Sequence, residues 1–230
     1  MVLANFLMLS QIAGHVILAI LSLLVIIPMT MNLHEFNHNC ILFATGTWRE
    51  SDGLFEVRWP STGFCNFPIF TGIFVFIISV LQIYKFGRLA HRNEEGGFLG
   101  LFIDVVFGIF MTMFAIISAI IVTLGFIVWC SDMTERFPSC DMAAGQNITD
   151  KSQNLDTSGF YFEMGTSQFG AWGCFAISVG VAVIALLKLI NNHQIRNIKV
   201  SMYLERQRLV NEDANVIHPD GRSTPSFPEL

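Results

Sequence analysis

Four long apolar runs divide this chain and decide what it can fold into. They cover residues 5–28, 67–84, 98–129 and 167–190. A helix needs roughly 20 residues to cross about 30 Å of hydrocarbon. The second run is short, but Lys85 can extend it by snorkelling. The third is too long for an upright span, so it must tilt or continue beyond the membrane. The runs predict an all-α membrane protein built on a bundle of four transmembrane helices.

The composition agrees with a membrane protein. Hydrophobic residues make up 53% of the chain and charged residues 13%, against about 25% charged in typical soluble proteins. The net charge of −5 is small, and the basic residues form no patch of the kind that binds nucleic acid. We therefore expect membrane lipids as partners, and no nucleic acid.

The basic residues between the runs predict the orientation. They are frequent in the short gap 85–97 and after residue 190, whereas the longer gaps 29–66 and 130–166 hold two each. Basic residues stay on the cytoplasmic side of a membrane. Both termini and the gap 85–97 are therefore predicted to be cytoplasmic, and the two long gaps to be outer loops.

One N-glycosylation sequon, Asn147-Ile148-Thr149, falls in the second outer loop. Glycosylation takes place on the lumenal side, so this position agrees with the predicted orientation and marks Asn147 as the acceptor. We expect an integral protein of the plasma membrane or of secretory and endosomal membranes.

Four cysteines lie in the predicted outer loops, which face an oxidising environment. Cys40 and Cys65 belong to the first loop, and Cys130 and Cys140 to the second. They predict two disulfides. Pairing within each loop, 40–65 and 130–140, is favoured because it needs no fixed geometry between the loops; pairing across the loops is the alternative.

The first outer loop carries the pattern of a small β-hairpin. Residues 40–48 and 54–59 are rich in β-branched and aromatic side chains, and the turn signal Ser51-Asp52-Gly53 separates them. A disulfide would brace this hairpin, which is marginal in isolation. Trp48 and Trp59 either face a partner or pack within the loop, and both interpretations are open.

Polar residues inside the runs predict one intramembrane cluster. Helical rise places His15 about 15 Å into the first span, with Gln11 one turn shallower and close to the depth of Asp104 in the third span. Intramembrane ionisable groups are costly and are often functional. Such a cluster would serve proton or cation handling; the alternative is hydrogen bonding between helices or residence in the headgroup region.

Small residues form a stripe on the fourth run. Gly170, Cys174, Ser178 and Ala182 recur at intervals of four, which lets another helix approach closely. That helix belongs either to the chain's own bundle or to a partner protein. After the fourth run, residues 191–212 read as a cytoplasmic amphipathic helix, and residues 213–230 as a disordered tail.

No residue pattern predicts an enzyme, a cofactor or a metal site. The letters His34-Glu35-Phe36-Asn37-His38 match HExxH, but they adjoin the end of a span and lack a third ligand. The chain also lacks a repeated half and the broken helices of transporters.

A recognisable pattern is carried by several segments between the first run and the fourth: 5–7, 34–36, 40–43, 46–48, 121–126, 129–130 and 168–172. These segments resemble the transmembrane protein 179 family. The resemblance implies a four-span integral membrane protein and brings no catalytic residues. More loosely, the layout looks like claudins, channel gamma subunits and MARVEL-domain proteins, although the Gly-Leu-Trp…Cys…Cys signature of claudins is missing.

The combined expectation is a non-catalytic accessory subunit or organiser. It would bind a larger membrane protein, such as an ion channel or a receptor, through its spans and outer loops. The alternatives are a small channel or transporter using His15 and Asp104, and a MARVEL-like organiser of vesicles or lipids.

Overall fold

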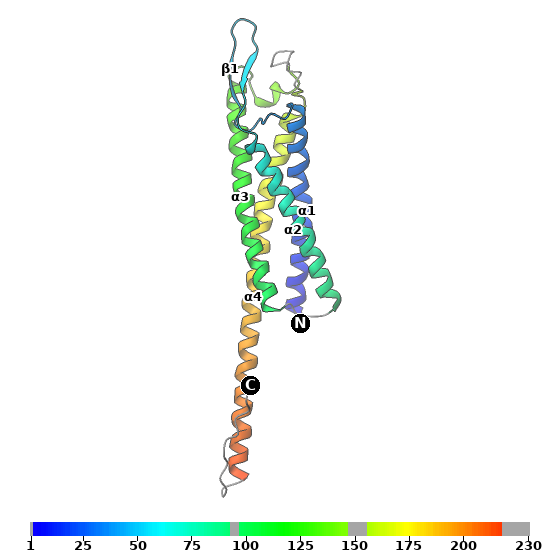
Figure 1. Cartoon of the computed structure of the whole chain (residues 1–230), viewed down its shortest axis with the longest axis vertical. Coiled ribbons are helices and arrows are strands. Elements are labelled where there is room, and N and C mark those ends of the chain that lie inside the picture. Colours follow the sequence, from blue (N-terminus) through cyan, green and yellow to red (C-terminus); the bar gives the residue numbers. More distant parts are fainter. Residues whose placement is uncertain (1, 93–96, 147–155, 218–230) are drawn as a thin grey trace. The chain divides into compact units, whose positions relative to one another are not determined.

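A computed structural model describes residues 2–92, 97–146 and 156–217 of the chain. Its elements, in chain order, are α1 (Val2–Glu35), β1 (Thr45–Trp48), β2 (Phe55–Arg58), α2 (Gly63–Arg92), α3 (Phe98–Thr134), the short 3-10 helix η1 (Cys140–Ala143) and α4 (Phe160–Ile217) (Figure 1). The chain forms two units, Met1–Lys188 and Leu189–Leu230.

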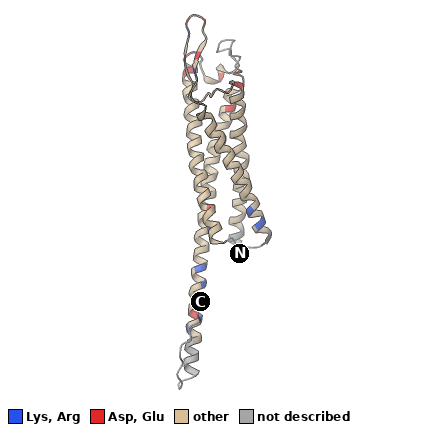
Figure 2. Cartoon of the chain, viewed as in Figure 1, with Lys and Arg blue, Asp and Glu red and all other residues tan. Residues whose placement is uncertain are grey.

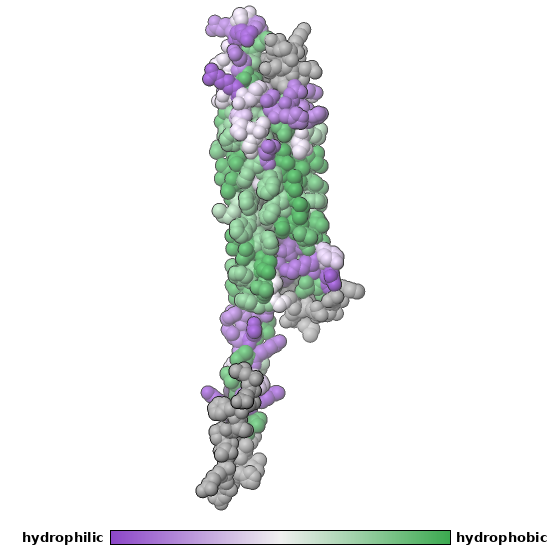
Figure 3. Space-filling model, in the orientation of Figure 1, coloured by the Kyte–Doolittle hydropathy of each residue, from purple (hydrophilic) through white to green (hydrophobic). Residues whose placement is uncertain are grey.

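Each of the four helices α1 to α4 contains one of the apolar runs, and each is long and apolar enough to cross a membrane. Hydrophobic side chains cover the middle of the bundle, and hydrophilic side chains gather at its loop end (Figure 3). The predicted fold class, a four-helix membrane bundle with a small two-stranded sheet, is confirmed. The third run exceeds a simple span because α3 continues into the loops, where Trp129 and Met133 are fully buried.

Small residues allow the helices of the bundle to approach closely. A Cβ added to Gly14 of α1 would lie 2.6 Å from Val181 of α4, and one added to Gly108 of α3 would lie 3.1 Å from the Cα atom of Ala182. In lipid no hydrophobic force drives helices together, so such close packing supplies much of the association energy. A void of about 10 Å³ remains where all four helices meet.

Substituting Gly108 with leucine is expected to destabilise the bundle by about 1–3 kcal/mol, because the new side chain would push α3 away from the α4 backbone. Gly180→Leu is the matched control: it lies on an exposed face of α4, and its added Cβ would meet no atom within 4 Å. Thermal unfolding of the two variants in detergent micelles measures the difference. Equal melting temperatures would contradict the packing described.

The loops form a compact head at one end of the bundle, made of residues 36–62, 130–146 and 156–159. Its sheet is an antiparallel hairpin in which Thr45 faces Arg58 and Trp48 faces Phe55. The hairpin stands beyond the end of α3 (Figure 1). Gly53 occupies the turn with a φ of 70°, a conformation that glycine adopts without strain.

The first strand is shorter than predicted, because residues 41–44 form a turn in which the Ala44 N–H donates to the Ile41 carbonyl. Phe43 has a φ of 64°, and its backbone N–H donates to the Gly125 carbonyl of α3 over 3.2 Å. A Cβ on Gly125 would lie 2.7 Å from the Cβ of Leu42. This segment is therefore seated on the helix surface and cannot pair with β2.

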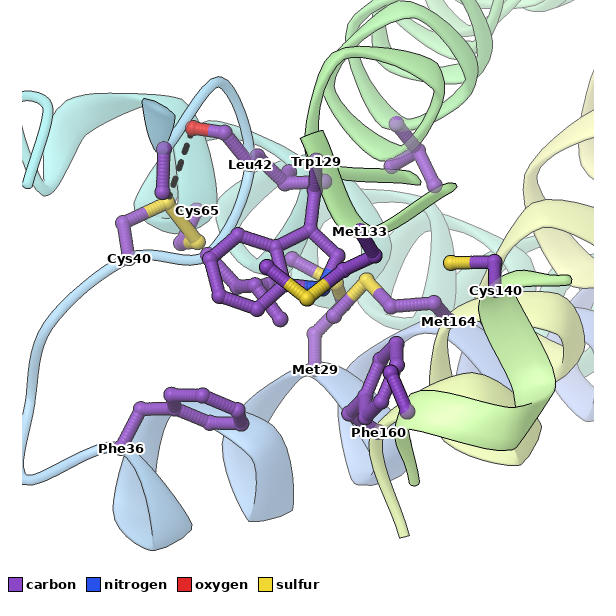
Figure 4. Close-up of a cluster of buried hydrophobic side chains, with 14 of the residues drawn as sticks. Met29, Phe36, Cys40, Leu42, Cys65, Trp129, Met133, Cys140, Phe160 and Met164 are labelled. Atoms are coloured by element: carbon purple, nitrogen blue, oxygen red, sulfur yellow. Dashed lines mark hydrogen bonds between the residues drawn. A yellow bond between two sulfur atoms is a disulfide. The ribbon is translucent and has the colours of Figure 1, made fainter. Parts of the chain in front are cut away.

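Each disulfide joins two cysteines of the same outer loop. The structure joins Cys40 to Cys65 and Cys130 to Cys140, which is the favoured pairing. Between them lies the core of the head, shown in Figure 4, in which Trp129, Phe36 and Phe160 are fully buried. The rings of Phe36, Phe55 and Phe160 lie 6.3, 5.8 and 6.2 Å from that of Trp129. The core connects α1, α3, α4 and the hairpin.

The C-terminal unit is helical from Leu189 through Ile217 as part of α4. It covers the predicted amphipathic segment 191–212 and runs a few residues past it, into the segment expected to be disordered. Side chains 193–210 of this unit are exposed. The rest of the tail and the acceptor Asn147 lie outside the described residues.

Candidate functional site

Polar side chains from all four helices meet near the end of the bundle that is opposite the head. This polar cluster consists of Gln11 and His15 on α1, Gln82 and Lys85 on α2, Asp104 on α3 and Lys188 on α4. The structure thus brings the predicted residues Gln11, His15 and Asp104 to one region of the bundle, and adds three residues that the sequence analysis did not assign to it.

Asp104 is the acceptor in one half of the cluster. Its Oδ1 atom accepts hydrogen bonds from Gln82 Nε2 at 2.9 Å and from Lys85 Nζ at 2.5 Å. The side chain of Asp104 is 5% exposed, and that of Lys85 is 37% exposed. The ion pair therefore joins a buried carboxylate to an ammonium group that reaches the surface. It ties α2 to α3.

Phe86 lies at the centre of the other half. The ammonium groups of Lys188 and Lys85 lie 4.8 and 5.5 Å from the centre of its ring, within the range of cation–π attraction. The ring of His15 stacks on Phe86 at 6.1 Å. Lys188 also donates a hydrogen bond to Gln11 Oε1. These contacts tie α1 to α2 and α4.

The cluster fastens all four helices to one another. Each of its charged groups has a partner: Lys85 and Asp104 pair with each other, and Lys188 binds Gln11 and the Phe86 ring. Buried polar networks rigidify a fold when their members are satisfied. Within the polar cluster, two buried atoms have no hydrogen-bond partner in the described structure: His15 Nδ1 and Gln82 Oε1. The arrangement is thus suited to holding the bundle together.

Three members of the cluster, Gln82, Lys85 and Lys188, are not predicted by the sequence analysis, because their positions have another ordinary explanation. Lysines at the cytoplasmic end of a span, such as Lys85 and Lys188, are usually anchors at the membrane surface. Gln82 precedes Lys85 by three positions and so shares its helix face. This spacing was the signal that could have added both residues to the prediction.

Removing the carboxylate of Asp104 by substitution with alanine is expected to cost about 2–3 kcal/mol. The loss of one partner of a buried pair usually costs more, but Lys85 can turn toward the surface. Asp52→Ala is the control, since the Asp52–Arg49 pair is exposed on both sides and such pairs contribute about 0–1 kcal/mol. Thermal unfolding of both variants tests this. A larger loss for Asp52→Ala would contradict the assignment.

The small-residue stripe of α4 packs inside the chain's own bundle. Gly170 lies against α1, where an added Cβ would be 3.0 Å from the Leu21 carbonyl oxygen. Cys174 and Ser178 are buried, and Ala182 lies against Gly108 of α3. The placement favours the intramolecular alternative over contact with a partner.

Trp48 and Trp59 also pack within the protein. The Trp48 ring lies 4.9 Å from Phe55 and 5.1 Å from the Arg136 guanidinium, and its Nε1 donates to the Asp132 carbonyl at 3.0 Å. Trp59 meets Phe36 edge to face at 6.1 Å. Both tryptophans are half-buried, so they brace the head more than they extend its surface.

The HExxH letters do not take the helical arrangement that the motif requires. Helix α1 ends at Glu35, and His38 has a φ of 64°, so His34 and His38 do not follow one another on a single helix face. Among residues 2–92, 97–146 and 156–217 no group of three His, Cys, Asp or Glu side chains is arranged to hold a metal ion.

The exposed part of the hairpin is charged. Arg49, Glu50, Asp52, Glu56 and Arg58 are all exposed there. Figure 2 shows acidic residues around the head and basic residues near the far end of α2. The polar surface of the head therefore carries charges of both signs on a hairpin that is held in place by the disulfides.

Four membrane-competent helices, with a disulfide-braced hairpin head between the first two, define a multi-pass membrane protein of claudin-like layout. A family model described as the Transmembrane protein 179/179B Claudin domain matches residues 7–210, and the chain belongs to this family. The resemblance found in the sequence is thereby confirmed. The relation to claudins, which the sequence suggested for the layout only, is part of the family's description. No solved structure matches the chain.

Proposed function

We propose that this protein is a non-catalytic accessory subunit or organiser that binds a larger membrane protein, such as an ion channel or a receptor. The head faces the outside or the lumen and makes the specifying contact, while the spans lie beside those of the partner. The observation that carries this proposal is the rigid attachment of a charged hairpin to the ends of the spans.

The rigidity of the head supports a role in recognition. Asp132 of α3 accepts a hydrogen bond from the Gly46 N–H of β1 at 2.9 Å, and Arg136 donates to the Gly53 carbonyl in the hairpin turn at 2.7 Å. Together with the disulfides, these bonds hold the hairpin on α3. A surface that is already ordered loses little conformational entropy on binding.

The charges of the head support a specific partner. Its exposed hairpin residues carry charges of both signs, with Arg49 and Asp52 near the turn and Glu56 and Arg58 on β2. Complementary charges at an interface increase specificity and the rate of association. The head therefore has the features of a recognition surface, and the lipid-facing apolar helices have the features of a membrane anchor.

The transport alternative has less support. Asp104, the residue on which it depends, already accepts hydrogen bonds from Gln82 and Lys85. His15 stacks on Phe86 within a closely packed bundle. These contacts favour a structural use of both residues. Reconstituted flux that falls on His15→Ala and Asp104→Asn substitution would restore the alternative.

Crosslinking of native membranes followed by affinity purification of the full chain tests the proposal. We expect one larger membrane protein to be recovered in a stoichiometric amount. Recovery of the chain as a free monomer would contradict the proposal. Recovery with bulk vesicle proteins in no fixed ratio would favour the organiser of vesicles or lipids instead.

A further inference from the structure

Two carboxyl groups meet where the bundle joins the head. Glu35 is the last residue of α1, and Glu163 lies in the first turn of α4. Their neighbours Phe36 and Met164 are fully buried in the core of the head (Figure 4), so both backbones are fixed. The two carboxyl groups approach each other there, and each has an oxygen beside Gly159.

One oxygen of each carboxyl group has no hydrogen-bond donor. Glu35 Oε2 and Glu163 Oε2 are buried and accept no hydrogen bond within the described part of the chain. Gly159 passes directly over the pair: a Cβ there would lie 3.1 Å from Glu163 Oε1 and 3.4 Å from Glu35 Oε2. An ionised carboxylate only accepts hydrogen bonds, whereas a protonated one also donates. Contact between the two groups therefore requires a proton.

The surroundings of the pair add negative charge. Asp156 lies in the segment before α4 and acts on both groups. Hydrogen bonds from the backbone N–H and the hydroxyl of Ser158 lower the pKa of Asp156, which keeps that group ionised. The other neighbours are His34, which adjoins Glu35, and the buried amide of Asn32, which is neutral. Neither carboxylate forms an ion pair with Lys or Arg in the described residues.

We infer that Glu35 and Glu163 share one proton, and that this carboxyl–carboxylate hydrogen bond joins the end of α1 to the start of α4. The proton comes from the surrounding medium, and its loss leaves two adjacent negative charges beside Asp156. Like charges in contact repel strongly. The link between the two helices thus holds at mildly acidic pH and weakens as the pH rises.

The sign of the effect follows from proton binding. The folded protein holds a proton that the unfolded chain, with separated glutamates of ordinary acidity, has released near neutral pH. Stability therefore falls as the pH rises through the range in which this proton is lost. The inference gives the head an acid-responsive connection to the spans, independent of the partner proposed above.

Thermal unfolding of the full chain in detergent micelles tests the inference. Wild-type protein is expected to melt roughly 2–5 °C higher at about pH 5.5 than at about pH 7.5. Glu163→Gln, which keeps a donor for Glu35 without the charge, should melt at the higher temperature at both pH values. Glu35→Gln should behave likewise. Glu56→Gln, on the exposed hairpin, is the control and should keep the wild-type dependence.

Two results would overturn the inference. One is a melting temperature of the wild type that does not change with pH, or a pH dependence that is the same in the wild type and in both glutamine variants. The other is a rise on adding Ca²⁺ at about pH 7.5 that both variants abolish, because the pair would then hold a cation in place of a proton. If either variant fails to fold, the pH profile of the other variant against Glu56→Gln decides.

Discussion

Replacing Trp129 with alanine is expected to lower the free energy of unfolding by about 3–5 kcal/mol, the usual cost of removing a fully buried aromatic side chain. The Trp129 ring is fully buried and meets the rings of Phe36 just after α1, Phe55 on β2 and Phe160 on α4. Its loss would leave a cavity where every part of the head joins. We expect the hairpin and the start of α4 to loosen together.

Trp172→Ala is the matched control for this prediction. Trp172 also belongs to a span, but its side chain is 41% exposed, and its main polar contact is a hydrogen bond from Nε1 to Thr123 Oγ1 at 3.0 Å. Its removal should cost about 1 kcal/mol. Thermal unfolding in micelles, followed by circular dichroism, compares the two variants. Similar losses would contradict a head organised around Trp129.

Removing the Cys40–Cys65 disulfide by substituting both cysteines with alanine is expected to cost about 3–4 kcal/mol. The bond spans 25 residues, and closing a loop of that length removes much of the entropy of the unfolded chain. The Cys130–Cys140 bond spans 10 residues, so its removal should cost less, about 2–3 kcal/mol.

Unfolding of the two double variants under non-reducing conditions tests this order. The free and buried Cys174 supplies the control, because Cys174→Ala removes a sulfur atom from the bundle without opening a loop. If the double variant of Cys40 and Cys65 has the same melting temperature as Cys174→Ala, the first loop needs no covalent brace. Intact cross-loop pairs, found by peptide mapping, would contradict the pairing itself.

The sequence alone predicts the features that depend on composition and on the distribution of residues between the two sides of the membrane. Lipid requires long apolar helices with their backbone bonds satisfied internally, so the four spans could be found by length alone. The hairpin was visible in its alternation and its turn signal. Its first strand was overextended, because the seating of Leu42 and Phe43 on Gly125 is a contact between distant segments that no local pattern records.

The polar cluster shows the limit of depth arithmetic. Helical rise placed Gln11, His15 and Asp104 at similar depths, and the structure brings them to one region. Depth does not say which way a side chain faces, so the partners of Asp104 were not identified. The same limit applies to Glu35 and Glu163, which are far apart in the sequence and meet only because α1 ends where α4 begins.

The partner-facing assignments depended on the same missing information. A stripe of small residues indicates close helix packing, but it is compatible with a partner inside or outside the chain. In the structure Gly170 meets α1 and Ala182 meets α3. Trp48 and Trp59 likewise contact Arg136 and Phe36 of the same chain. The charged side of the hairpin is therefore left as the better candidate for recognition.

Recovery of the partner by a hairpin variant tests the central proposal most directly. The charge-reversed chain Arg49→Glu/Arg58→Glu and the matched chain Arg196→Glu/Lys199→Glu, altered in the C-terminal unit, are expressed and purified beside the wild type from crosslinked native membranes. The proposal predicts that the amount of co-purified larger membrane protein falls about tenfold or more for the hairpin variant, which is equivalent to about 1.4 kcal/mol. The C-terminal variant should recover as much of it as the wild type. Equal recovery by all three chains, or recovery of none, would contradict a recognition role for the head.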